Sequence, residues 1–258
     1  MMGELKGKTA IVTGASRGIG QSVSRALAGE GMDLVLAARG GEVLREVAES
    51  LSREFGVRVL PVACDITRQA DLENLAGKSI GEFGKIDALI NSAGVSSQYP
   101  FPEQPLEDIA MLMYTNYFGA VMLTRLMVNH FMANKGGAII NITSGSTLVD
   151  PPPRNFIVYS SLKRALNAFN KGLFWEVRDY GIKVTSIMPG VTDTALTGGL
   201  AEVSVDKSRL IQTSIIEDAV KFALSVPANV CPLEISVINQ RTPWTKPVIP
   251  YRQEHPEK

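Results

Sequence analysis

Short apolar runs alternate with longer amphipathic stretches along most of the chain, and turn residues separate them. Continuous apolar runs such as residues 33–38 and 138–143 indicate strands that are buried on both faces. Stripes such as Val43, Val47 and Leu51 repeat at helical spacing between such runs. The pattern predicts strands over residues 9–13, 33–38, 57–62, 86–91, 138–143, 182–188 and 233–238.

This alternation predicts an α/β fold with a Rossmann-like, doubly wound parallel sheet of about seven strands and helices on both faces. One long helical region is expected over residues 106–131, and Ser214 with Glu217 predicts a capping box before the last helix. No repeat or polar linker divides the sequence, so we expect a single domain over residues 1–258. Its proline-rich end, residues 241–258, is expected to form an extended tail.

Composition removes several classes of function. The 26 basic and 26 acidic residues give a formal net charge of zero, so no nucleic-acid partner is expected. The two cysteines and two histidines are scattered, and we expect no metal site. No apolar run approaches the length of a membrane span and no signal peptide is visible, so a cytoplasmic protein without a membrane partner is expected.

Tyr159 and Lys163 form the first candidate chemical pair. Residues four apart share one face of a helix, with Cβ atoms about 6 Å apart. A phenol titrates near ~10, and a neighbouring cation favours its ionised form. The pair therefore predicts a group that can donate and accept a proton near neutral pH. Taken alone, this spacing is also common on solvated helix faces.

A glycine-rich turn, T-G-A-S-R-G-I-G at residues 13–20, lies between the first predicted strand and the first predicted helix. Glycines there permit a tight turn and close approach of a ligand, and the free N–H groups at the start of the helix favour an anion. The sequence therefore predicts a pyrophosphate site, although a tight turn without a ligand has the same composition.

With the turn and the pair together, the sequence resembles the short-chain dehydrogenase/reductase family over roughly residues 7–238. Further motifs follow in the family's order: Asp65, Asn91-Ser92-Ala93-Gly94 in place of N-N-A-G, Asn116, Ser144, Pro189-Gly190 and Thr194. The resemblance implies four catalytic residues, which are Asn116, Ser144, Tyr159 and Lys163. It implies that Tyr159 exchanges a proton with the substrate oxygen and that Ser144 hydrogen-bonds this oxygen. It also implies that Lys163 holds the nicotinamide ribose and that Asn116 anchors a water of the proton relay.

The position of the serine departs from the family pattern. The family usually places this serine two residues nearer to the tyrosine, which here is Ser146. The end of the predicted strand favours Ser144, with two extra residues in the loop that holds Pro151-Pro152-Pro153. We expect Ser144 to act on the substrate and Ser146 to face it, so the expected substrate contacts are Ser144, Ser146 and Tyr159.

The resemblance also implies a nicotinamide dinucleotide cofactor. The second predicted strand ends in Ala37-Ala38-Arg39 without the carboxylate that would bond the ribose 2′-hydroxyl of NAD. Arg39 and Arg17 can instead pair with a 2′-phosphate, so NADP(H) is favoured over NAD(H). The expected cofactor-binding residues are Gly14, Ser16, Arg17, Gly18, Ile19, Gly20, Arg39, Asp65, Ile66, Asn91, Ala93, Gly94, Tyr159, Lys163, Pro189, Gly190, Val191 and Thr194.

The expected activity is NADP(H)-dependent interconversion of a ketone and a secondary alcohol. The alternatives are a catalytically silent dinucleotide-binding regulator and a reductase of thioester-linked 3-oxoacyl substrates. Residues 95–99, 146–156 and 191–210 are expected to form a mainly apolar substrate pocket, and Thr197-Gly198-Gly199 is expected to let a lid move. By resemblance, the protein is expected to be a homodimer or homotetramer.

Overall fold

Seven parallel strands form one sheet in the order β3-β2-β1-β4-β5-β6-β7 in the computed structural model, which describes residues 4–194, 196 and 205–244. The strands are β1 Thr9–Thr13, β2 Asp33–Ala38, β3 Val59–Ala63, β4 Ala88–Asn91, β5 Gly137–Ile142, β6 Ile182–Pro189 and β7 Glu234–Val237. This confirms the predicted fold class. The strand order changes direction between β1 and β4, and open parallel sheets bind ligands beyond the carboxyl ends of their strands at such a point.

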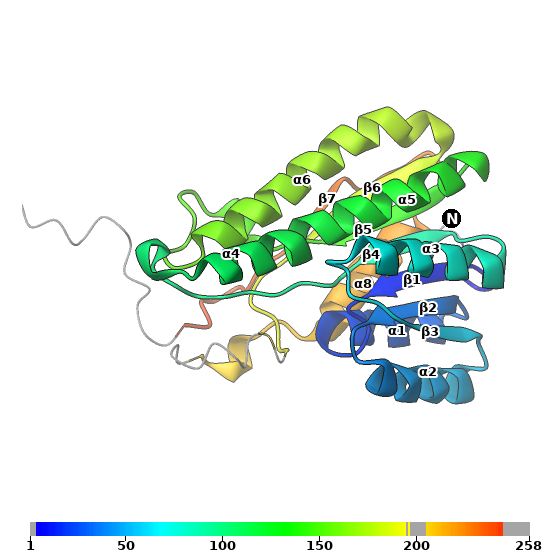
Figure 1. Cartoon of the computed structure of the whole chain (residues 1–258), viewed down its shortest axis with the longest axis horizontal. Helices are drawn as coiled ribbons and strands as arrows, with labels where there is room; N and C mark the ends of the chain where they lie inside the picture. Colours follow the sequence, from blue (N-terminus) through cyan, green and yellow to red (C-terminus); the bar gives the residue numbers. More distant parts are fainter. Residues whose placement is uncertain (1–3, 195, 197–204, 245–258) are drawn as a thin grey trace, which may run out of the picture.

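Helices cover both faces of the sheet, as Figure 1 shows. One face packs against α1 Gly18–Gly29, α2 Gly41–Phe55 and α8 Thr213–Ser225, and the other against α3 Gln69–Phe83, α5 Gly119–Ala133 and α6 Ile157–Val177. In β2, Leu34 and Leu36 join the first core while Val35 and Ala37 join the second. The continuous apolar run is therefore explained by burial of both strand faces.

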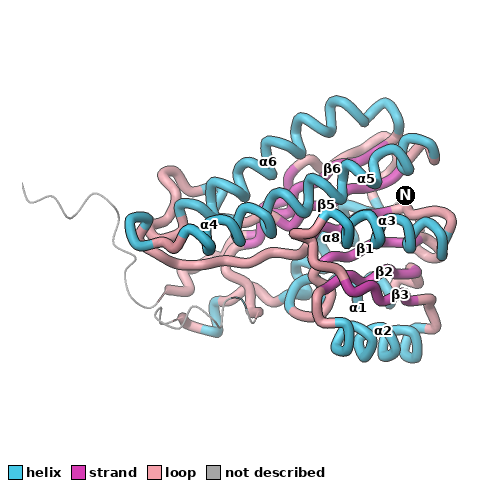
Figure 2. Tube along the Cα trace, in the orientation of Figure 1, coloured by secondary structure: helices cyan, strands magenta, loops and turns pink. Residues whose placement is uncertain are grey.

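Long loops extend beyond the carboxyl ends of the strands (Figure 2). Of the expected tail, the structure describes residues 241–244, and Trp244 forms an isolated bridge with Val205. The predicted lid residues 197–199 and most of the tail, residues 245–258, lie outside the described residues.

The predicted helix over residues 106–131 is interrupted. The structure has α4 Leu106–Met113, a π-helical turn Tyr114–Phe118 and then α5. The Asn116 side chain accounts for the interruption, because its Nδ2 donates to the Leu112 carbonyl at 3.1 Å, a group that a regular α-helix would use internally. Such a side-chain contact leaves no trace in hydrophobic periodicity.

The predicted capping box at Ser214 and Glu217 is wrong. Helix α8 begins at Thr213, and its N-cap residue Gln212 makes no side-chain capping bond. The Glu217 carboxylate instead accepts a hydrogen bond from the Ser22 hydroxyl on α1. The side chain of Glu217, which the local pattern predicted to cap α8, therefore makes a tertiary contact with α1 instead.

Candidate active site

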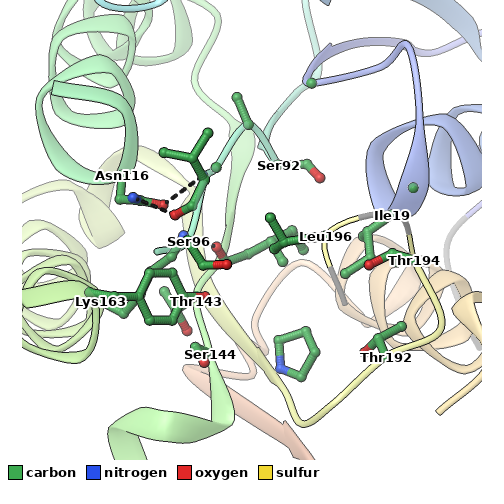
Figure 3. Close-up of a pocket in the computed structure, with 18 of the residues that line it drawn as sticks. Ile19, Ser92, Ser96, Asn116, Thr143, Ser144, Lys163, Thr192, Thr194 and Leu196 are labelled. Carbon is green, nitrogen blue, oxygen red and sulfur yellow. Dashed lines mark hydrogen bonds between the residues drawn. The ribbon is translucent and has the colours of Figure 1, made fainter. Parts of the chain in front are cut away.

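A cavity of about 1080 Å³ lies at the carboxyl ends of the strands. All of the site residues predicted from the sequence line it except Asn91. They come from the turn after β1, the ends of β2 to β6, the π-helical turn Tyr114–Phe118 and helix α6, so the fold brings together segments that are far apart in the sequence. Figure 3 shows Lys163, Thr143 and Ser144 on one side of the cavity, with Ile19 and Thr194 on the other.

The glycine turn closely approaches the neighbouring backbone. Gly14 has a φ of +68°, and a Cβ at this position would lie 2.8 Å from the Ala93 Cα. The Thr13 hydroxyl, which the sequence analysis did not single out, accepts hydrogen bonds from the N–H groups of Ser92 and Ala93, both at 3.1 Å. The turns after β1 and β4 are thus joined, and the start of α1 faces the cavity as an anion site requires.

One end of the cavity carries Arg17, Arg39 and Asp65. Burial opposes ionisation of Asp65, but hydrogen bonds from the N–H and hydroxyl of Thr67 and the charges of Arg39 and Arg68 outweigh it and lower the pKa of its carboxyl group. Asp65 and Thr67 form a turn before α3 rather than its cap, because the N-cap residue of this helix is Arg68. Asp65 is therefore held as a carboxylate on the cavity wall.

The other end brings Ser144, Tyr159 and Lys163 together. Lys163 is 4% exposed, its Nζ donates to the Ile142 carbonyl at 3.1 Å, and this nitrogen lies 5.9 Å from the centre of the Tyr159 ring. Burial lowers the pKa of Lys163 to about 8. The structure thus places the pair on one face of α6, as the spacing predicted.

The pKa of Tyr159 differs from the expectation. Burial raises it above the ordinary value of 10.0, while a hydrogen bond with the Ser144 hydroxyl acts in the opposite direction. The simple argument from a neighbouring cation considered only charge and omitted desolvation of the phenolate. In this structure desolvation is the larger effect.

The hydrogen bond to Tyr159 distinguishes Ser144 from Ser146. Ser144 Oγ also accepts from the Ser146 N–H at 3.1 Å, so it caps the 3-10 turn Gly145–Leu148, and Thr147 Oγ1 donates to the Ser144 carbonyl at 2.7 Å. Ser146 lines the cavity, and its hydroxyl has no hydrogen-bond partner within the described part of the chain. Both serines thus face the cavity, and Ser144 is the one next to the phenol.

Asn116 holds the turn after β4. Its Oδ1 accepts from the Val95 N–H at 3.3 Å and its Nδ2 donates to the Val95 carbonyl at 2.8 Å (Figure 3). A Cβ on Gly94 would lie 3.0 Å from Asn116 Oδ1 and 3.4 Å from Lys163 Nζ. The amide therefore lies beside the lysine and fixes the backbone next to it.

Asn91 lies behind the cavity wall, not on it. Its Nδ2 donates to Asn141 Oδ1 at 2.8 Å and to Thr124 Oγ1 at 3.2 Å, and Asn141 donates in turn to Asn170 Oδ1 at 2.6 Å. These side chains are buried, and their hydrogen bonds join β4 and β5 to α5 and α6. The structure therefore gives the Asn91 side chain a place in the scaffold, and the expected contact of this segment with the cofactor is one made largely through backbone.

The segment after β7 supplies cavity residues that the sequence analysis missed. Asn239 and Trp244 line the cavity, and Asn239 Oδ1 accepts from the Val191 N–H at 2.8 Å. Asn239 Nδ2 donates to the carbonyls of Val191 and Arg209 at 2.9 and 2.8 Å. No local pattern marks these residues, because their role depends on contacts with a distant loop.

Comparison with known proteins assigns the family. Residues 8–203 match the family described as short chain dehydrogenase. The chain is 31% identical over 236 residues to an uncharacterised oxidoreductase of Staphylococcus epidermidis, which covers 92% of this chain and 99% of that protein. The protein therefore belongs to the short-chain dehydrogenase/reductase family of oxidoreductases, which bind a nicotinamide dinucleotide.

Solved structures of two enzymes agree with this assignment. L-sorbose reductase from Gluconobacter frateurii, complexed with NADPH and L-sorbose, superposes with a TM-score of 0.82 at 30% identity, covering 91% of this chain and 96% of its own. A 3-ketoacyl-(acyl-carrier-protein) reductase from Brucella melitensis, complexed with NADH, gives a TM-score of 0.82 at 26% identity, covering 92% and 99%. Similar proteins with this fold have thus been solved in complex with NADPH and with NADH.

Two further findings concern only the residues that the structure describes. None of their helices is both long and apolar enough to cross a membrane. They also contain no cluster of three or more histidine, cysteine, aspartate or glutamate side chains arranged to hold a metal ion.

Proposed function

We propose that this protein is an NADP(H)-dependent oxidoreductase that interconverts a ketone and a secondary alcohol. The observation that carries the proposal is the hydrogen-bonded pair Ser144–Tyr159 beside the buried Lys163, in the same cavity as the glycine turn. The cofactor, when bound, supplies or accepts the hydride. The described residues fit such a group, since the turn approaches closely at Gly14 and the start of α1 faces the cavity.

Tyr159 exchanges the proton in this proposal. In the reducing direction its hydroxyl donates a proton to the carbonyl oxygen, and it takes one from the alcohol in the reverse direction. Ser144 Oγ accepts from the Ser146 N–H, and in this proposal its single hydroxyl hydrogen, which otherwise bonds the phenol oxygen of Tyr159, is donated to the substrate oxygen. Both hydroxyls thus converge on the atom where negative charge develops.

Lys163 supplies the positive charge. An ammonium group has three N–H donors, and the Ile142 carbonyl takes one of them. The remaining donors can hold the ribose hydroxyls of the cofactor, and the charge favours the ionised form of Tyr159 when the alcohol is oxidised. Asn116, which fixes the turn beside Lys163, completes the proposed catalytic set.

The preference for NADP(H) rests on Arg17 and Arg39. Both line the cavity, both are exposed, and the residue that follows β2 is Arg39 instead of a carboxylate. A guanidinium pairs well with a phosphate. The bound NADPH of the similar sorbose reductase supports this assignment, and the NADH bound to the acyl-carrier-protein reductase defines the competing outcome.

Titration with NADPH and NADH, followed by fluorescence, tests the cofactor. We expect NADPH to bind at least about tenfold more tightly, which corresponds to ~1.4 kcal/mol. Arg39→Asp should remove this preference, whereas Arg45→Asp on the exposed side of α2, outside the cavity, should keep it. Equal or tighter binding of NADH by the unaltered protein would contradict the assignment of Arg39.

Tyr159→Phe tests catalysis. The variant should bind NADPH as the unaltered protein does and lose turnover of every carbonyl substrate, because the proton donor is gone. Unchanged function in this variant would favour a dinucleotide-binding regulator. A substrate screen that includes 3-oxoacyl thioesters tests the remaining alternative. If only these compounds are reduced, at the 3-oxo group, and free ketones are not, the substrate is a thioester-linked acyl chain.

Assembly and location belong to the same proposal. We propose a homodimer or homotetramer in the cytoplasm, formed through the long helices. Met113 and Tyr114 at the end of α4 and Trp175 on α6 are 51%, 50% and 61% exposed, which leaves apolar area for a second copy. Light scattering of the purified protein should give a mass of two or four chains, and a monomer would contradict the proposed assembly.

A further inference from the structure

Large apolar side chains from separate parts of the chain converge on the end of the cavity that holds Tyr159. Leu196 and Ile238 line the cavity although they are 43% and 52% exposed, and Val149 lines it at 49% exposure. Soluble proteins keep contiguous exposed apolar surface small, and concave patches of this kind are typical of ligand sites. An apolar ligand would remove this surface from water.

Side-chain contacts place Phe156 and Ile238 beside the chemistry. The rings of Phe156 and Tyr159 meet edge to face with centroids 6.4 Å apart. A Cβ on Gly145, the residue after Ser144, would lie 2.8 Å from Ile238 Cδ1. The Val149 carbonyl accepts a hydrogen bond from Arg164 on α6, the residue after Lys163. Leu196 projects into the same cavity (Figure 3).

The segment after β7 closes this apolar end. Pro243 and Trp244 line the cavity, and the Pro243 carbonyl accepts from the Asp206 N–H at 2.8 Å. Arg209 donates to the Thr242 carbonyl at 3.0 Å and forms an ion pair with Asp206 at 2.8 Å. The wall formed by this segment is thus tied to the loop that follows β6, so it belongs to the built site.

Charged groups are few at this end. Among the described cavity residues, Asp65, Arg17 and Arg39 lie at the other end and Lys163 beside Tyr159, while Arg154 stands exposed near the apolar wall. Arg154 already has an interaction within the chain. Apart from Lys163 beside Tyr159, Arg154 is thus the one charged group that the described residues place at this apolar end, which favours a neutral substrate.

We infer that the substrate is a neutral ketone, or the matching secondary alcohol, with a bulky apolar substituent that packs against Val149, Phe156, Leu196, Ile238 and Trp244. This inference rests on the proposed function, because it assigns the substrate class of the same site. The carbonyl oxygen meets Ser144 and Tyr159, and the apolar substituent covers the exposed wall. Selectivity then increases with the apolar area of the ketone and is lost when hydroxyl groups replace methylenes.

A series of 2-alkanones from 2-butanone to 2-octanone, assayed by NADPH oxidation, tests the inference. Each added methylene that becomes buried should raise kcat/KM about fourfold until the pocket is filled. Two polar probes complete the series: dihydroxyacetone carries a hydroxyl group on each carbon next to the carbonyl, and 5-oxohexanoate has a carboxylate in place of the terminal methyl group of 2-hexanone. Both should be reduced more slowly than 2-hexanone.

Variants locate the effect. Leu196→Ser and Ile238→Ser should reduce the increase of kcat/KM with the chain length of the ketone, because each replaces an apolar side chain of the wall by a hydroxyl group. Ile215→Ser is the matched control, since Ile215 is 48% exposed on α8 and lies outside the cavity, and it should leave the dependence unchanged.

The outcomes separate this inference from the proposed function. Reduction of alkanones with no dependence on chain length, or faster reduction of dihydroxyacetone or 5-oxohexanoate, would keep the proposed function and overturn the apolar substrate class. A dependence that survives both wall variants would also overturn it. NADPH binding without reduction of any carbonyl compound would overturn the proposed function and this inference with it.

Discussion

Asn239 allows a test of how the turn after β6, which we propose binds the cofactor, is held in place. Its amide makes three hydrogen bonds, one from the Val191 N–H and two to the carbonyls of Val191 and Arg209, at 2.8 to 2.9 Å. A hydrogen bond of this kind contributes roughly 1 kcal/mol net. Asn239→Ala should therefore lower the free energy of unfolding by about 1 to 3 kcal/mol, with the smaller value where water replaces the lost partners.

The same change should weaken cofactor binding. Val191 lies in the turn that carries Thr194, and both are among the expected cofactor-binding residues. Once the amide no longer fixes this turn, ordering it costs free energy on binding, and a cost of ~1.4 kcal/mol is a tenfold rise in Kd. Fluorescence titration with NADPH and urea unfolding measure the two effects separately. The KM for NADPH should rise more than kcat falls.

Asn239→Asp separates hydrogen bonding from packing. The carboxylate has the same shape and can still accept from the Val191 N–H, but it has no donor for the two carbonyls and places negative charge beside them. It should therefore bind NADPH no better than Asn239→Ala, while Gln240→Ala at the exposed neighbour should behave as the unaltered protein. If Asn239→Asp binds NADPH normally, the amide does not position the turn and the reasoning is refuted.

Three further predictions follow from backbone strain and from buried titratable groups. Gly14→Ala should abolish NADPH binding and lower the Tm more than Gly7→Ala does. Both glycines have positive φ (+68° and +77°), but only at Gly14 would the Cβ meet neighbouring backbone, at 2.8 Å. Equal losses of Tm in the two variants would contradict this prediction. Burial lowers the pKa of Lys163 from 10.5 to about 8, so the unfolded state binds more protons between these values. As pH rises through this window, the free energy of unfolding measured in urea should increase by about 3 kcal/mol more for the unaltered protein than for Lys163→Met. The same pH dependence in both proteins would contradict this prediction. Burial also lowers the pKa of His130 below 6.5, where its Nε2 accepts from the Ile86 N–H at 3.0 Å. The free energy of unfolding should therefore decrease as pH falls below 6.5. If His130→Gln shows the same pH dependence, other groups cause the decrease and the prediction is wrong.

Residue patterns predicted the sheet well because burial on both strand faces imposes a simple signal. All seven strands form, although β3 and β4 begin two residues later than predicted, at Val59 and Ala88. The short motifs were also informative, since glycine turns and strand-end polar residues occur where the strands of a parallel sheet end together. The sequence therefore located both ends of the cavity.

The features that the sequence analysis did not predict depend on contacts between distant segments. The π-helical turn follows from one amide that reaches Leu112, and the false cap at Glu217 follows from a partner on α1. The pKa of Tyr159 is raised because burial outweighs charge, and burial is a property of the folded site. Trp244 lines the cavity, and its segment pairs with residues 205–209, which are distant in the sequence.

Asn116 and Asn239 show how such distant contacts organise the site. Each amide accepts from the N–H and donates to the carbonyl of a single valine, Val95 after β4 and Val191 after β6. In the sheet these strands flank β5, after which Ser144 lies. The turns on both sides of the reactive serine are thus fixed by side chains from separate elements, and such support gives a site defined geometry before a substrate arrives. Ser144 directly follows the backbone hydrogen bond from the Thr143 N–H to the Ile187 carbonyl at 2.8 Å, so its position depends on the 3-10 turn that it caps and on the neighbouring turns.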